Sequence, residues 1–88
     1  MSIEVSKIRE QFPALRREAI FFDNPGGTQI AQASIDRSLE YLIQHNANHG
    51  GAFETSRASD AVVDESRRAV ADFFNAGRAE EIVFGPNM

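Results

Sequence analysis

The chain has 88 residues, of which 42% are hydrophobic and 25% are charged, a composition typical of a folded domain and not of a disordered tail. The net charge of −4 argues against a nucleic-acid partner, and the absence of cysteine excludes disulfides, thiolate metal sites and a thiol nucleophile from this sequence. No basic stretch followed by an apolar run opens the sequence, and no run approaches the roughly 18 apolar residues of a membrane span. We therefore expect a cytoplasmic protein without a membrane partner.

The first elements expected are a short helix and a short strand. Val5, Ile8 and Phe12 recur at helical spacing, and Pro13 ends that pattern. Three consecutive apolar residues within the range 20–23 then predict a buried strand that ends in an acidic residue.

A loop of small residues follows this strand. Proline fixes its own φ and drives the preceding residue towards extended geometry, while glycine can adopt positive φ and lets a ligand approach the backbone. A strand that ends in an acidic residue and a loop of small residues commonly presents a binding site. Asp23 could bind a ligand, but an acidic residue at the end of a strand more often accepts hydrogen bonds from nearby backbone N–H groups. The alternative is an ordinary turn formed by the same four residues, Asn24, Pro25, Gly26 and Gly27.

A second helix is expected over residues 31–46, where Ile35, Leu39 and Leu42 recur at helical spacing. Asparagine and glycine residues in the range 46–51 end it with a loop. That loop carries His49, which is either a site residue or a loop histidine without a catalytic contact.

The third and longest helix is expected to begin at a capping Thr55 or Ser56 and to end near Asn75. Phe73 belongs to its apolar face, which we expect to be buried. Asp60 lies on the opposite face, which we expect to be solvated.

A second strand is predicted over residues 82–84, and a loop follows it. The order helix, strand, helix, helix, strand indicates the α/β class. Two strands so far apart in sequence need a larger sheet, because an isolated strand pair is marginal in water. We therefore expect residues 1–88 to be a single segment, the incomplete amino-terminal part of a larger protein.

Three stretches share their order and spacing with a known enzyme family. They are FFDNPGG at residues 21–27, NHGG at 48–51 followed by Ser56, and RRAVADFFNA at 67–76 followed by EEIVF at 80–84. Together they resemble the amino-terminal segment of class V aminotransferase-type enzymes, the pyridoxal-phosphate group that includes cysteine desulfurases, selenocysteine lyases and isopenicillin-epimerase-like proteins. The last stretch is the most specific of the three.

This resemblance implies part of the fold-type-I architecture of pyridoxal-phosphate-dependent transferases. It implies that the loop Asn24–Gly27 and His49 lie on the substrate side, with His49 near the mouth of the active site of a homodimer. It also implies that Asn87 and Met88 begin the loop that holds the cofactor phosphate through backbone N–H groups. The family usually has glycine and threonine at these two positions, and it often has arginine where Gly50 stands, which suggests a less typical branch.

The chemistry of the family requires a lysine that bonds the cofactor aldehyde. The only lysine is Lys7, which precedes all the matching stretches. We therefore expect no catalytic residue and no metal ligand here, and a segment that is inactive alone and binds pyridoxal 5′-phosphate only within the intact enzyme.

The function implied is the amino-terminal part of an enzyme that acts on an amino acid by a lyase, desulfurase or epimerase step. Its partners would be the rest of the enzyme chain, a second subunit and the amino-acid substrate. The alternative is a stand-alone small α/β protein-interaction module, in which a partner or a second copy covers the apolar helix faces.

Overall fold

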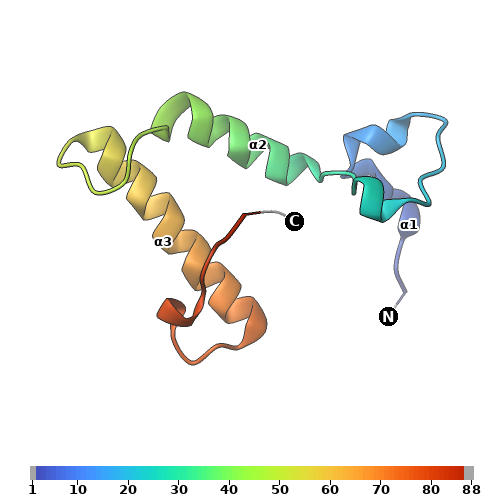
Figure 1. Ribbon diagram of the computed structural model, residues 1–88. Helices are drawn as coiled ribbons and strands as arrows, with labels where there is room; N and C mark the ends of the chain where they lie inside the picture. Colours follow the sequence, from blue (N-terminus) through green and yellow to red (C-terminus); the bar gives the residue numbers. More distant parts are fainter. Residues whose placement is uncertain (1, 87–88) are drawn as a thin grey trace. The chain divides into compact units, whose positions relative to one another are not determined.

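The computed structural model describes residues 2–86, which belong to two compact units divided between Leu42 and Ile43 (Figure 1). Asn87 and Met88, which the resemblance assigns to the phosphate loop, lie outside the described residues. None of the helices in residues 2–86 combines the length and the apolar character that crossing a bilayer requires.

The first unit begins with helix α1, Val5–Glu10, and a 3₁₀ turn η1, Pro13–Arg16, that packs against it. Proline occupies the start of η1, so α1 ends ahead of Pro13 as the sequence predicts. A second 3₁₀ turn, η2, covers Asn24–Gly26. Helix α2, Gln32–Glu40, follows, and its first N–H donates to the backbone oxygen of Gln11 at 2.7 Å.

A π-helical turn, η3, Tyr41–His45, continues the chain beyond α2. The two together confirm the helix expected over residues 31–46.

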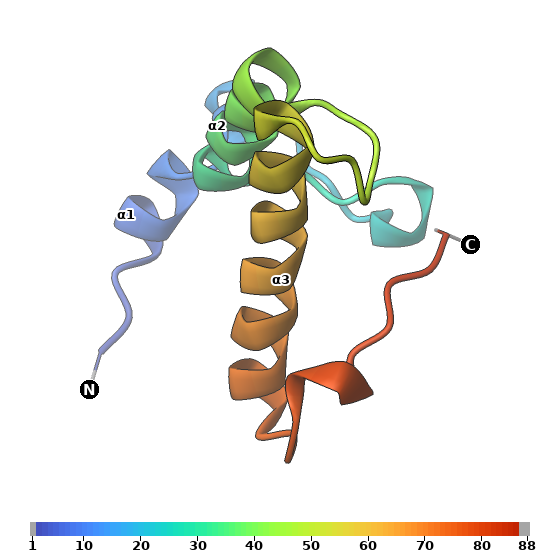
Figure 2. The ribbon, with the colours of Figure 1, turned by 90° about the vertical axis from the view of Figure 1, so that its left-hand side faces the viewer.

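The second unit is built on helix α3, Glu54–Phe74, of 21 residues. The helix ends where Asn75 adopts the left-handed conformation, at φ 55° and ψ 42°. The N–H of Ala76 donates to the oxygen of Ala71 at 2.8 Å, which is the bond pattern of a Schellman cap. The 3₁₀ turn η4, Ala79–Glu81, packs against α3, and Figure 2 shows the chain turning back after it.

The two strands expected over residues 20–23 and 82–84 are not seen, since no residue from 2 to 86 belongs to a strand. Ile82 does have extended angles, φ −90° and ψ 122°. Strand structure also needs a neighbouring strand whose N–H and C=O groups complete the ladder. Local sequence supplies the extended backbone but not that neighbour, so the helix–strand order remains an expectation for the family fold.

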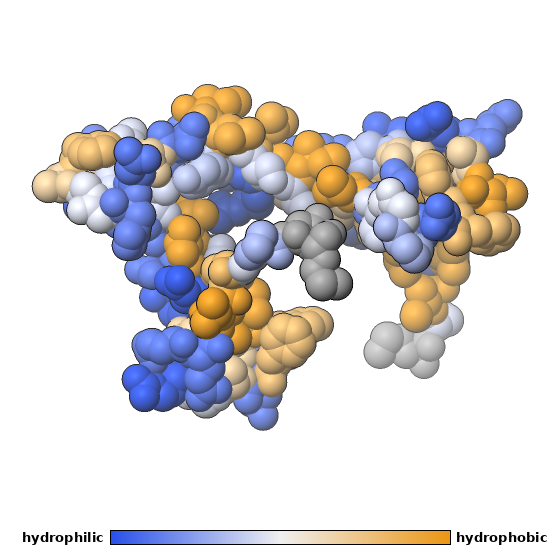
Figure 3. Space-filling view, viewed as in Figure 1, coloured by the Kyte–Doolittle hydropathy of each residue, from blue (hydrophilic) through white to orange (hydrophobic). Residues whose placement is uncertain are grey.

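Little apolar surface is buried within either unit. Among residues 2–86, Ala71 is the only buried hydrophobic residue, and Phe22, Phe73 and Val83 are 93%, 83% and 84% exposed. The expectation that Phe73 is buried is therefore wrong for this structure, because η4 packs against α3 without covering the Phe73 side chain. Figure 3 shows apolar side chains open at the surface.

Candidate functional site

The loop at Asn24–Gly27 forms a tight turn in the first unit. Gly26 and Gly27 donate their N–H groups to the oxygens of Asp23 and Asn24, each at 3.0 Å. Gly27 has φ 148°, a conformation that side-chain-bearing residues rarely adopt, so the expected positive φ is confirmed at this position. The side chain of Asp23 makes no capping hydrogen bond to the turn, contrary to expectation; its backbone oxygen does so instead.

A pocket of about 360 Å³ lies beside this turn within the first unit. Asn24 is the one residue of the predicted loop site that lines it, and Pro25, Gly26 and Gly27 are exposed. The segment expected to be the first strand supplies much of the lining, which includes Phe12, Leu15, Ile20, Phe21, Phe22 and Thr28.

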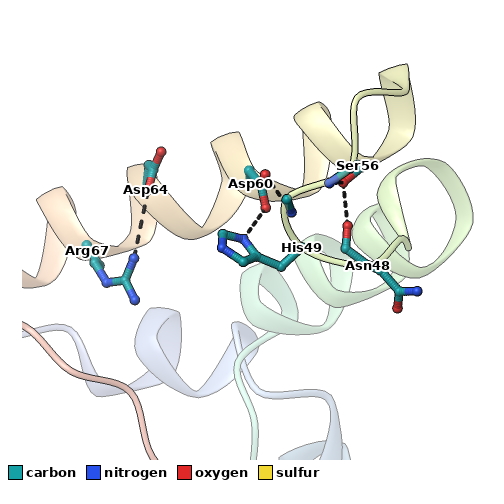
Figure 4. A network of polar contacts seen from close by, with 8 residues as sticks. Asn48, His49, Ser56, Asp60, Asp64 and Arg67 are labelled. Carbon is teal, nitrogen blue, oxygen red and sulfur yellow. Dashed lines mark hydrogen bonds and ion pairs between the residues drawn. The ribbon is translucent and has the colours of Figure 1, made fainter.

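His49 lies in the second unit, in the loop that precedes α3, and its ring reaches the second turn of that helix. Its Nδ1 atom is 2.6 Å from Oδ1 of Asp60, and the Gly50 N–H donates to Oδ2 of the same carboxylate at 3.2 Å (Figure 4). The His49 side chain is 92% exposed and that of Asp60 only 28%. The sequence pattern predicts that Asp60 lies on a solvated face of the helix. In the structure its carboxylate instead binds the loop.

Ser56 ties the same loop to the first turn of α3. The Gly51 N–H donates to the Ser56 hydroxyl oxygen at 2.8 Å, and that hydroxyl donates to the Asn48 carbonyl oxygen (Figure 4). Ser56 is fully buried. The helix begins at Glu54 and has no side-chain N-cap, so the expected cap by Thr55 or Ser56 is wrong. The Ser56 hydroxyl bonds the preceding loop instead of the helix N-terminus.

We call these contacts the loop–helix clasp, formed by residues 48–51 together with Ser56 and Asp60. Its electrostatics favour an ionised carboxylate. The hydrogen bond with His49 is the main cause of a lowered pKa of Asp60, and the Gly50 N–H adds to it, while partial burial opposes it. Sequence reasoning missed Asp60, because only the return of the loop onto the helix brings it beside a residue 11 positions earlier.

The segment that leads towards the predicted phosphate loop lies beside α3 in the second unit. The Arg67 guanidinium sits 5.8 Å from the centre of the Phe84 ring and 3.8 Å from the Asp64 carboxylate. The cation thus contacts the segment 82–84 through an aromatic face. Within residues 2–86 no group of three His, Cys, Asp or Glu side chains could hold a metal ion.

Comparison with known proteins connects these features to one family. The family model described as aminotransferase class-V matches residues 20–87. An aminotransferase-like protein of Gibberella zeae is 41% identical to this chain, and a cysteine desulfurase of Serratia proteamaculans is 37% identical; each alignment covers 96% of this chain and 22% of the relative. A probable cysteine desulfurase of Mycolicibacterium paratuberculosis is 39% identical over 92% of this chain and 13% of its own length.

The chain thus spans about a fifth or less of the length of these relatives. The family model nevertheless covers well over half of the sequence, from the strand-like segment at residue 20 to the predicted phosphate loop. The chain belongs to the class-V aminotransferase family.

Proposed function

We propose that this chain is the amino-terminal part of a pyridoxal-phosphate-dependent enzyme that acts on an amino acid, in the manner of a desulfurase or lyase. The family match over residues 20–87 carries this proposal, and relatives named cysteine desulfurase that align with 96% of the chain support the substrate class. The intact enzyme would be cytoplasmic, as the composition leads us to expect, and a homodimer, as the resemblance implies.

In this proposal the chain contributes to two parts of the active site. The loop Asn24–Gly27 and His49 contact the substrate side. Asn87 and Met88 offer backbone N–H groups to the cofactor phosphate. When bound, pyridoxal phosphate supplies an aldehyde that bonds amines and a ring that withdraws electrons from the substrate.

The residues of this chain do not form a complete site for that cofactor. The aldehyde needs a lysine amine, and Lys7, the only lysine in the sequence, is exposed on α1 ahead of every motif that matches the family. We therefore assign no catalytic step to this chain, and the lysine must come from another part of the intact enzyme.

Borohydride reduction tests the proposal. Pyridoxal phosphate is added to the intact enzyme and to the 88-residue chain, each is reduced, and the modified lysine is located by mass spectrometry. We expect one specific label in the intact enzyme on a lysine outside residues 1–88, and no label on Lys7 beyond that of free lysine in solution. Lys7→Arg should leave the label of the intact enzyme unchanged. Stoichiometric labelling of Lys7, or an intact enzyme that binds no cofactor, would contradict the proposal.

The alternative, a stand-alone interaction module, draws on the exposed apolar side chains such as Phe22 and Phe73. Sedimentation and amide NMR distinguish the two. A well-dispersed, monomeric 88-residue chain would favour an independent module. For part of an enzyme we expect the helices to form locally, while the exposed apolar side chains associate or lack fixed packing.

A further inference from the structure

We infer that Asp60 is the positioning residue of His49, and that residues 48–60 by themselves hold the imidazole so that Nε2 is the nitrogen presented to the substrate. This inference deepens the proposed function and rests on it, since that proposal places His49 on the substrate side. Neither the resemblance nor the comparisons assign a role to Asp60.

The two oxygens of Asp60 have separate partners. Oδ1 lies 2.6 Å from Nδ1 of His49, and Oδ2 accepts the Gly50 N–H at 3.2 Å. A carboxylate held at both oxygens has a fixed orientation, and the second bond comes from the residue next to the histidine. Asp60 therefore holds both the His49 ring and the backbone at the next residue, Gly50.

The chemistry of the pair determines which ring nitrogen bears the proton. An ionised carboxylate only accepts hydrogen bonds, so the short contact requires that Nδ1 donates. Nδ1 then carries a proton in both the neutral and the charged imidazole. Nε2 is then the ring nitrogen that faces away from Asp60, and the 92% exposure of the side chain leaves it accessible.

Ser56 makes the arrangement local and stiff. It is fully buried and bonds the Gly51 N–H on one side of the loop and the Asn48 carbonyl on the other. The residues that flank His49 are thus fastened to the first turn of α3, while Asp60 fastens the ring to the second. Every group in the clasp comes from 13 consecutive residues, so no other part of the chain is needed to build it.

Nitrogen NMR of the 88-residue chain with ¹⁵N-labelled histidine tests the inference directly. For the neutral form of the His49 ring we expect a proton-bearing shift at Nδ1 and an unprotonated shift at Nε2, the reverse of the tautomer that free histidine prefers. The variant His45→Gln identifies the signals. Carbon shifts of residues 54–60 in the same sample report whether the first turns of α3 are formed.

Asp60→Asn should abolish this tautomer preference, because the amide offers a donor as well as an acceptor. Asp64→Asn is the matched control, since it removes the same charge one turn further along α3 without touching the loop, and it should leave the tautomer unchanged. A formed helix with the proton on Nε2 in the unmodified chain would overturn the role of Asp60. An unformed helix would overturn the claim that residues 48–60 are sufficient.

The intact enzyme provides the functional arm. Asp60→Asn should lower kcat/KM by about tenfold, the factor that corresponds to loss of one hydrogen bond to a charged group, with cofactor content unchanged. Asp64→Asn should lower it by less than about twofold. Equal loss in both variants would overturn the inference, whereas an intact enzyme without cofactor would contradict the proposed function and leave the tautomer result standing.

Discussion

Asp60 illustrates how the environment of one residue depends on a backbone turn that helical periodicity does not encode. The pattern of α3 places it among charged residues, yet its side chain is only 28% exposed because the loop of His49 folds back onto it. The composition of the loop, rich in asparagine and glycine, correctly predicts a turn. Its direction depends on Gly50, at φ 79°, and on the buried hydroxyl of Ser56.

The hydrogen bonds to Asp60 give a pH dependence whose sign is fixed. Its pKa in the folded chain is below the ordinary value of 3.8, chiefly because of the hydrogen bond with His49. A lowered pKa means that the contribution of Asp60 to stability is fully present above pH 3.8 and is lost as the pH falls through the lowered value. The clasp should therefore loosen in acid.

Carbon NMR of the Asp60 carboxyl group measures this titration. We expect a midpoint below 3.8 in the unmodified chain and an upward shift in His49→Phe, which removes the main cause of the lowering. His45→Phe, which removes the other histidine, should leave the midpoint of Asp60 where it was. An unchanged midpoint in His49→Phe would show that the ring does not contact the carboxylate.

At the scale of elements, the sequence predicts the features that depend on neighbouring residues, namely the helices and the places where they end. The apolar periodicity places α3, and α2 together with η3, close to their observed bounds, and Asn75 ends α3 as expected because asparagine tolerates the left-handed conformation. The residue ranges 20–23 and 82–84 have the composition of strands, but strand pairing depends on partners elsewhere. The sequence indicates a loop of small residues at Asn24–Gly27, and the structure forms a turn there. Its part in substrate binding stays a prediction.

Ser56→Ala tests the junction between the loop and α3. The substitution removes a fully buried hydroxyl that accepts the Gly51 N–H and donates to the Asn48 carbonyl. We expect the free energy of unfolding to fall by about 1–3 kcal/mol, because two hydrogen bonds worth about 0.5–1.5 kcal/mol each are lost. Urea denaturation followed by circular dichroism measures this change.

Ser66→Ala is the matched control on the same helix. The Ser66 hydroxyl donates to the Val62 carbonyl one turn back, a bond that adds little to a helix. Alanine has the higher helix propensity, so we expect a change within about 0.5 kcal/mol. Equal losses for the two serines would mean that Ser56 does not fasten the loop.

At the scale of the whole molecule, exposed apolar side chains connect the chain to the enzyme that we propose contains it. Composition gives the number of apolar residues, and periodicity places Phe73 on an apolar face of α3. Neither determines what covers that face. In this structure Phe73 is 83% exposed and contacts the Phe74 ring edge-on, with 5.1 Å between ring centres.

Phe73→Ala should therefore have different effects in two contexts. In the 88-residue chain we expect a loss of about 1 kcal/mol or less in the free energy of unfolding, most of it from the contact with Phe74. In the intact enzyme, where our proposal has other segments covering α3, the loss should reach about 3–5 kcal/mol, as for a buried phenylalanine. Urea denaturation of both proteins measures the difference.

Asp72→Ala is the control, an exposed substitution in the same turn of α3, and it should change the free energy of unfolding by no more than about 0.5 kcal/mol in each protein. A large loss in the 88-residue chain would mean that the chain buries Phe73 by itself, and a small loss in both would mean that this face of α3 stays open to solvent in the enzyme.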